Sequence, residues 1–217
     1  MKVTRITGGP LPTNCYLLTD DVTGKTAIID PGFISAELTS AILTANADVE
    51  NVKLILLTHG HFDHIMGVAE IKKLTHAKVC IYSDDMMFTT DNSLNLSTMM
   101  IPAPMQTFTA DVALNDGDVI ELGSLSVRVI YTPGHTVGSC CYLVEDALFT
   151  GDTLMKCSCG RTDFPTGSYP QMLDSLARLK NLEGDYHVYP GHDCETTRGY
   201  ERKNNPFMES NAYDSNY

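Results

Sequence analysis

Residues 52–64 read VKLILLTHGHFDH, and this stretch decides which fold the rest of the sequence is expected to adopt. Its first seven residues form an almost continuous apolar run, which is typical of a β-strand buried on both faces. The run leads directly into His59, His61, Asp63 and His64. Because residues two apart in extended backbone point the same way, His59 and His61 can hold one metal ion together. Asp63 and His64 follow where a helix is expected to begin, and they can reach a second ion nearby.

Three further segments repeat this order of strand, glycine-containing turn and metal-binding side chain. VRVIYTPGH ends at His135, ALFTGD ends at Asp152 and HVYPGH ends at His192. Turns that follow strand ends lie at the edge of a sheet, so four such turns can converge on one site. Each residue alone fits an ordinary role, a hydrogen-bonded turn histidine or an aspartate that caps a turn or helix. Together with the first stretch, they indicate a shared metal site.

The predicted metal site holds two ions. His135 completes a three-histidine group with His59 and His61, and His192 joins Asp63 and His64. Asp152 has two carboxylate oxygens, so it is expected to bridge the ions. Each ion then keeps an open position for water, which is what separates a catalytic site from a closed structural one. Such water loses a proton near neutral pH, and the site predicts hydrolysis by a metal-bridging hydroxide, with the catalytic residues Asp63, Asp152 and His192.

Length and composition agree with a single enzyme domain. The 217 residues predict one domain over residues 1–209 and a frayed tail over residues 210–217. The net charge of −12 argues against non-specific nucleic-acid binding, and no apolar run is long enough to span or anchor in a membrane. Seven cysteines without disulfide-like spacing indicate reduced thiols in the cytoplasm. Strands that alternate with helices predict a mixed α/β fold with helices outside the sheets.

The four metal-binding segments resemble the successive metal motifs of the metallo-β-lactamase superfamily. The resemblance runs from the TNCY stretch at Thr13 to the last predicted helix. It implies an αββα sandwich, that is, two mixed β-sheets flanked by helices with the metals at one edge. Within the superfamily the chain is similar to the small type II glyoxalase (hydroxyacylglutathione hydrolase) group, which GRTDFP and the closing PGH, TT, GYE and NNPF stretches support. The resemblance implies hydrolysis of small-molecule thioesters such as S-lactoylglutathione with two divalent ions. Zinc is favoured, and iron and manganese are alternatives.

Two departures from the glyoxalase pattern bear on the substrate. Classical type II glyoxalases carry a further C-terminal helical domain that helps to hold glutathione, and Cys194 stands where that family tends to have a tyrosine. Arg161 falls where the family has a basic substrate anchor, although it can equally pair with Asp163. Asp30 ends a predicted strand and is either a turn residue or the carboxylate that orients a metal-binding histidine.

Other functions are known for the fold that this resemblance implies. A persulfide dioxygenase would use one iron held by the equivalents of His59, His135 and Asp152, and all three residues are present. Lactam hydrolysis is disfavoured because true β-lactamases of this fold usually carry a cysteine at the position of Asp152. Flavodiiron chemistry is disfavoured because the flavodiiron proteins carry an acidic residue at the position of His61. A non-catalytic metal protein is disfavoured by the complete ligand set, and a nuclease by the acidic charge.

Overall fold

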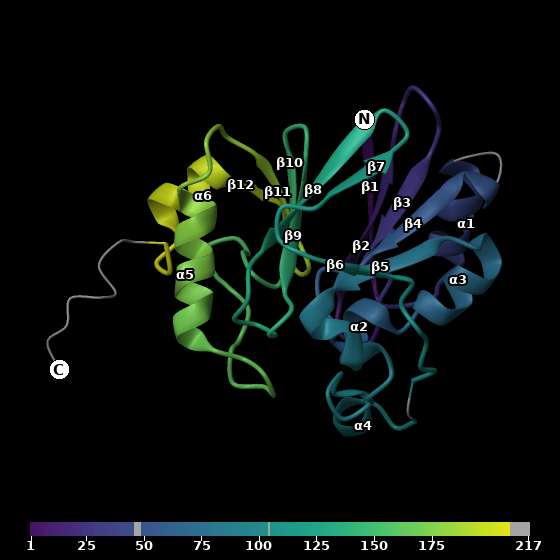
Figure 1. Ribbon diagram of the computed structural model, residues 1–217, viewed down its shortest axis with the longest axis horizontal. Helices are drawn as coiled ribbons and strands as arrows, with labels where there is room; N and C mark the ends of the chain where they lie inside the picture. The colour runs from purple at the N-terminus through teal and green to yellow at the C-terminus, as the bar shows by residue number, and fades with distance from the viewer. Residues whose placement is uncertain (46–48, 104, 209–217) are drawn as a thin grey trace, which may run out of the picture.

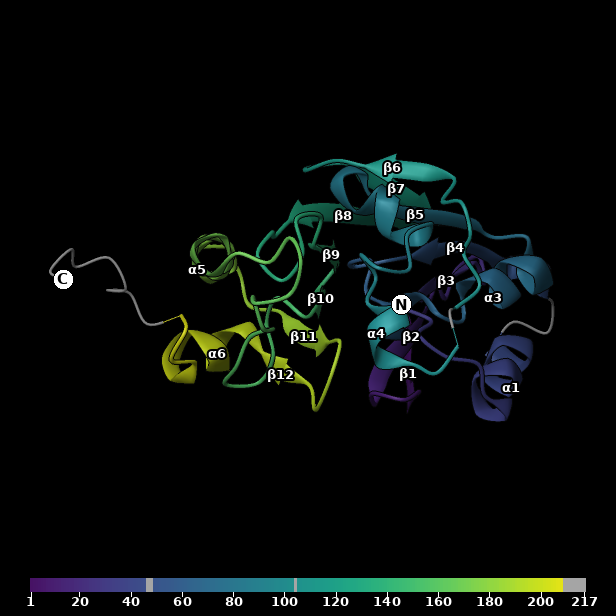
Figure 2. The same ribbon diagram turned by 90° about the horizontal axis from the view of Figure 1, so that it is seen from below.

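Two six-stranded β-sheets pack face to face in the computed structural model, which describes residues 1–45, 49–103 and 105–208 (Figure 1). The first sheet has the order β1-β2-β3-β4-β5-β6, and the second has the order β12-β11-β10-β9-β8-β7. Helices α1 and α3 lie outside the first sheet and α5 and α6 outside the second (Figures 1 and 2). The predicted αββα sandwich of two mixed sheets is confirmed.

The elements have the following bounds. The strands are β1 Lys2–Gly8, β2 Thr13–Thr19, β3 Thr26–Ile29, β4 Val52–Leu56, β5 Lys78–Tyr82, β6 Val112–Leu114, β7 Val119–Leu122, β8 Leu125–Tyr131, β9 Cys140–Val144, β10 Ala147–Gly151, β11 His187–Pro190 and β12 Thr196–Thr197. The helices are α1 Ala36–Ala45, α2 Phe62–Ile65, α3 Val68–Thr75, α4 Ser97–Met100, α5 Tyr169–Lys180 and α6 Arg198–Asn204, with 3-10 turns η1 Val49–Asn51 and η2 Ser83–Thr89.

The central strands are apolar on both faces because each sheet has a core on either side. In β2, Cys15 and Leu17 belong to the core under the helices of the first sheet, whereas Tyr16 and Leu18 belong to the core between the sheets. Successive side chains of a strand point to opposite faces, so an uninterrupted apolar run satisfies both cores. This arrangement explains why β4 and its neighbours lack the polar alternation of a half-exposed sheet.

The outer helix of the second sheet follows an equally plain sequence pattern. The Ser168 side chain caps α5 by accepting a hydrogen bond from the Gln171 backbone N–H at 3.5 Å. Met172, Leu176 and Leu179 then recur at helical spacing and are completely buried against the second sheet. The sheet is therefore closed on its outer side by one amphipathic helix and the shorter α6.

Strand direction brings the ends of several strands to the same edge. In the second sheet β8 and β10 are each antiparallel to β9, and β10 is parallel to β11, so β8, β10 and β11 run in one direction. In the first sheet β3, β4, β5 and β6 are parallel to one another. Side chains that follow the carboxyl ends of such strands lie in one crevice, which is where open α/β sheets bind ligands.

The helix expected to begin near Asp63 is short, and the chain forms two helices, α2 and α3, in its place. The chain breaks at Gly67, whose backbone N–H donates to the Pro31 carbonyl at 2.9 Å. A Cβ atom at Gly67 would lie 2.5 Å from the Phe33 carbonyl oxygen, so only glycine fits this close approach. The strands β6 and β12, with three and two residues, were not predicted.

The last predictions concern the domain boundary, the C-terminal tail and membrane-spanning helices. The predicted tail over residues 210–217 lies outside the described residues, and the single domain over residues 1–209 stays a prediction. None of the helices in the described parts of the chain is long and apolar enough to cross a membrane.

Candidate metal centre

Seven predicted ligands come together at the edge where four strands end. His59 and His61 follow β4, the short helix α2 carries Asp63 and His64, and the other three ligands follow β8, β10 and β11. All but His192 are buried, and the His192 side chain is 21% exposed. The residues concerned are His59, His61, Asp63, His64, His135, Asp152 and His192.

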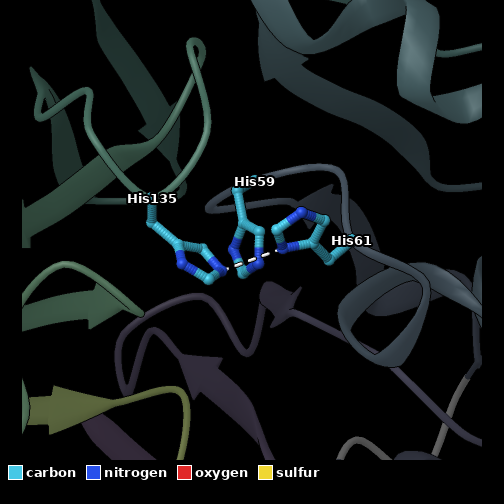
Figure 3. A group of neighbouring side chains, drawn as sticks. All are labelled: His59, His61 and His135. Carbon is cyan, nitrogen blue, oxygen red and sulfur yellow. Dashed lines mark hydrogen bonds between the residues drawn. The ribbon is translucent and has the colours of Figure 1, made fainter. Parts of the chain in front are cut away.

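The first group consists of His59, His61 and His135, whose rings converge in Figure 3. Nδ1 of His61 lies 2.9 Å from Nε2 of His135, and one ring nitrogen from each of the three side chains lies within 4.8 Å of the others. The ring centroids are 4.6 to 4.9 Å apart. Three imidazoles held this closely fit the ligand set of a single transition-metal ion.

The second group consists of Asp63, His64 and His192. Nε2 of His64 lies 3.3 Å from Nε2 of His192, and Oδ2 of Asp63 lies 3.3 Å from Nε2 of His192. Two imidazole nitrogens and one carboxylate oxygen therefore face a common point. This nitrogen and oxygen set suits zinc, iron or manganese.

Asp152 lies between the two groups. Its Oδ2 atom is 3.4 Å from Nε2 of His135 and 3.5 Å from Nε2 of His192, one residue from each group. Its Oδ1 atom is 3.4 Å from Nε2 of His64. The two oxygens of one carboxylate thus reach both groups, which is the placement that a bridging ligand requires.

The unpaired polar atoms of the cluster fit bound cations. In the described structure, Nε2 of His59, Nε2 of His61 and Oδ1 of Asp152 are buried and make no hydrogen bond. A buried polar atom without a partner costs roughly 1–3 kcal/mol, and three in one cluster are unusual for a native protein. Cations bound among these side chains would offset that cost, so the donor set matches a binuclear metal site.

The electrostatics of the cluster differ between its two halves. Burial, reinforced by the neighbouring His135, lowers the pKa of His61 to about 3, so its imidazole is neutral and its lone pair is free for a metal. Burial also opposes a charge on His64, but the carboxylates of Asp152 and Asp63 raise the pKa of His64 well above its usual value. The carboxylate-rich half therefore attracts positive charge, whereas the histidine-rich half presents unprotonated nitrogens.

The ring nitrogens that face away from the cluster are anchored by acceptors. Nδ1–H of His64 donates to Oδ2 of Asp30 at 3.0 Å, and Nδ1–H of His135 donates to the Arg161 carbonyl at 2.7 Å. Nδ1–H of His192 donates to the Pro12 carbonyl at 3.0 Å. Such contacts fix which nitrogen is left for the metal and how the ring is turned.

Asp30 contacts both a histidine of the second group and the residue before His59. Besides His64, it accepts hydrogen bonds from the backbone N–H and the hydroxyl of Thr58, at 2.8 and 2.6 Å. Thr58 directly precedes His59. The Asp30 backbone has a φ of 49°, a left-handed conformation that aspartate tolerates better than most residues. The carboxylate therefore links the ends of β3 and β4 to the second metal group.

The predicted substrate residues lie in different surroundings. The Arg161 guanidinium forms two hydrogen bonds of 2.7 Å with Asp163, the pairing that the sequence left open. Arg161 also lines a cavity beside the metal ligands. Cys194 is exposed and is not among the described residues that line this cavity.

Sequence reasoning missed Asp85, a completely buried carboxylate in η2. It accepts hydrogen bonds from the Gly60 N–H at 2.9 Å, the Thr136 hydroxyl at 2.7 Å and the Gly138 N–H at 2.7 Å. These donors lie in the two loops that carry the three histidines of the first group. Burial raises the pKa of Asp85 to about 6. The local sequence SDDMM gives no signal for this role, because the partners are distant in the chain.

Gly191 offers a test of how closely the cluster is packed. A Cβ atom at this position would lie 2.4 Å from Oδ1 of Asp152 and 2.6 Å from Cε1 of His64. Gly191→Ala is therefore expected to push the bridging carboxylate away from the second group, at a cost of roughly 1–3 kcal/mol. We expect the variant to lose one bound metal ion before the other, as measured by metal analysis after dialysis. Retention of both ions at wild-type affinity would contradict this geometry.

A two-sheet sandwich with paired histidine and aspartate groups at one edge defines the class as an αββα metalloprotein whose ligand set suits two ions. Residues 8–192 match the family model described as the metallo-beta-lactamase superfamily. The chain therefore belongs to the metallo-beta-lactamase superfamily.

Curated relatives include proteins named hydroxyacylglutathione hydrolase. The protein from Haemophilus influenzae, named GloC, is 33% identical over 92% of this chain and 94% of its own length. The protein from Rhodopseudomonas palustris is 38% identical over 82% of this chain, which corresponds to 61% of that protein. These names, together with the superfamily, support a metallo-hydrolase.

Several solved structures share the fold. The BLEG-1 B3 metallo-beta-lactamase superimposes with a TM-score of 0.87 at 33% identity, covering 96% of this chain and all of that one. A di-iron-bound form of TTHA1623 gives a TM-score of 0.77 at 31% identity, with 94% and 99% of the chains covered. ETHE1 from Myxococcus xanthus superimposes with a TM-score of 0.74 at 31% identity, covering 95% of this chain and 84% of that one.

Proposed function

We propose that the protein is a metal-dependent hydrolase of thioesters, that is, of S-acyl thiols such as S-lactoylglutathione. The observation that carries the proposal is the pair of adjacent ligand groups joined by Asp152 at a cavity. The relatives named hydroxyacylglutathione hydrolase support it, because one of them matches this chain over almost its whole length.

The ligand set supports two divalent ions, with zinc proposed as the metal and iron or manganese as alternatives. His59, His61 and His135 would hold the first ion, while Asp63, His64 and His192 would hold the second, with Asp152 shared between them. When bound, such a pair acidifies water and polarises a carbonyl group. The di-iron form of TTHA1623 supports iron as an occupant of a site of this kind.

The side chains of this protein set the position of the reacting carbonyl. Asp63, His135, Asp152 and His192 all line the cavity, so a substrate there meets both ligand groups at once. The Asp30 and Arg161 acceptors prevent His64 and His135 from turning. A site already held in its reactive geometry needs little reorganisation during the reaction.

Thioesters suit this site because their leaving group needs no proton donor. A thiol has a pKa of roughly 8.5, so the thiolate departs readily near neutral pH, whereas an amide nitrogen must be protonated as it leaves. Among the described residues that line the cavity, the titratable side chains are metal ligands except for Arg161, which stays protonated. The cavity therefore offers no obvious general acid, and this favours thioesters over lactams.

Metal analysis combined with a substrate panel tests the proposal. We expect about two ions per chain in protein purified without added metal, and turnover of S-lactoylglutathione or another thioester. A chelator should abolish that activity, and added zinc should restore it. The panel includes a chromogenic cephalosporin because BLEG-1 is a B3 metallo-beta-lactamase. Faster cleavage of the lactam than of every thioester would contradict the proposal.

The same experiment separates the runner-up function, a persulfide dioxygenase with one iron. The likeness to ETHE1 supports this alternative, and its three ligands His59, His135 and Asp152 lie together in the cluster. One iron per chain with oxygen uptake on a persulfide would favour it.

We also propose a cytoplasmic location, which the seven unpaired cysteines of the structure support.

A further inference from the structure

The cavity beside the metal centre is apolar except at the predicted metal ligands and Arg161. Its volume is about 310 Å³, at the small end of the range for small-molecule sites. Beyond the metal ligands, the wall is formed by side chains from four separate segments of the chain. The apolar lining residues are Leu11, Phe62, Leu96, Met100, Met155 and Phe164.

Arg161 is the one lysine or arginine among the described lining residues, and its charge is already paired. Nε and Nη2 of Arg161 each lie 2.7 Å from a carboxylate oxygen of Asp163. The guanidinium carbon also lies 4.0 Å from the centre of the Phe164 ring, so one face of the group is covered. Asp163 therefore occupies the Nε and Nη2 edge of the guanidinium, which is one of its two-pronged contact edges.

The Arg161 loop has a second role that keeps it in place. The Arg161 carbonyl accepts the hydrogen bond from His135, and the Phe164 ring packs edge-on against the His61 ring at 5.8 Å. Moving this loop to bind an anionic thiol would disturb two ligands of the first metal group. The loop is therefore better suited to support the metal site than to recognise charge.

An S-acyl glutathione brings two carboxylates and one ammonium group, and the one lysine or arginine among the described residues that line this cavity is Arg161, which already pairs with Asp163. Met100 and Leu11, which are 43% and 39% exposed, place apolar surface at the accessible part of the cavity.

We infer that the substrate is a thioester of a small uncharged thiol with a short apolar acyl chain, and that glutathione is not the preferred thiol. This inference rests on the proposed thioester hydrolysis and specifies its substrate class. Each methylene of the acyl group that enters the cavity contributes by burial, so kcat/KM should rise roughly fourfold per carbon until the cavity is full.

Binding of thioethers, which cannot be hydrolysed, tests the inference on the metal-loaded protein. S-butyl-N-acetylcysteamine is the uncharged probe and S-butylglutathione the charged one, both followed by calorimetry. We expect the uncharged probe to bind at least tenfold more tightly, on the order of the loss from leaving two carboxylates unpaired. Equal affinities, or tighter binding of the glutathione probe, would overturn the inference.

A pair of neighbouring methionines supplies a matched control. Met100 lines the cavity, whereas Met99 is 62% exposed and is not among its described lining residues. Met100→Lys should weaken binding of the uncharged probe roughly tenfold and narrow the difference in affinity between the two probes. Met99→Lys should leave both affinities unchanged. An equal effect of both substitutions would overturn the assignment of this wall.

Kinetics separates failure of this inference from failure of the proposed function. Turnover that is fastest with S-lactoylglutathione would overturn the inference and leave thioester hydrolysis standing. No turnover of any thioester by protein with both metals bound would overturn both, whatever the binding preference.

Discussion

Replacing His61 with alanine is expected to lower kcat/KM for thioester hydrolysis by roughly 1000-fold, while the protein keeps its fold. His61 is one of three histidines in the first ligand group, and its Nδ1 lies 2.9 Å from Nε2 of His135. Loss of one ligand of three removes the ion or displaces it, and the electrostatic stabilisation that a metal supplies is worth several kcal/mol. Steady-state kinetics and metal content, measured on the same sample, check the result.

The fold is expected to survive because the removed imidazole is poorly paired without a metal. Its Nε2 is buried and makes no hydrogen bond in the described structure, so its removal offsets part of the lost packing. Circular dichroism and thermal unfolding in the presence of a chelator should therefore show a variant close to wild type. The metal-loaded proteins should differ more in thermal stability, because only the wild type gains stability from an ion held by the complete first group.

His187→Ala is the matched control for this prediction. His187 begins β11, lies outside the metal cluster and pairs with Glu195 at 2.8 Å on the surface. Its side chain is 42% exposed, so its loss should change activity less than twofold and stability by less than about 0.5 kcal/mol. Wild-type turnover in the His61→Ala variant, or equal losses in both variants, would contradict the site assignment.

The metal ligands were predictable because each one follows directly from a strand signal. An apolar run such as residues 52–58 fixes a buried strand, and a turn after that strand places His59 and His61 at the sheet edge. The same reasoning placed His135, Asp152 and His192 at the ends of β8, β10 and β11. What the pattern alone could not supply was the approach of the two sheets, which the resemblance to a family provided.

The contacts that hold the ligands in place were not predictable, because they join residues distant in sequence. The break at Gly67 depends on the carbonyls of Pro31 and Phe33, which no local pattern reveals. The pairing of Arg161 with Asp163 is local, yet the role of the Arg161 carbonyl in holding His135 is not. Local propensity predicts elements, whereas tertiary packing decides which backbone groups meet.

Asp85→Ala is expected to weaken the first metal group without removing any ligand. The Asp85 carboxylate ties the Gly60 N–H to the Thr136 hydroxyl and the Gly138 N–H, and so joins the loop of His59 and His61 to that of His135. Its loss leaves the buried Gly60 and Gly138 N–H groups unpaired and leaves Ser139 Oγ as the partner of the Thr136 hydroxyl, so we expect the free energy of unfolding to fall by roughly 3 kcal/mol. Metal affinity should fall about 10- to 100-fold, as for other contacts that orient metal ligands.

The measurement that isolates this role is competition with a chelator, because a merely structural defect would not change metal affinity selectively. Asp85→Asn keeps the shape and one acceptor oxygen, so it should recover part of both the affinity and the stability. Asp84→Ala is the control, since Asp84 is the exposed neighbour and its loss should have little effect. If Asp85→Ala lowered stability but kept wild-type affinity for both ions, Asp85 would serve the fold alone. The loops of the first group would then hold their histidines without it, through the His135 contact with Arg161 and the His59 contact with Thr58.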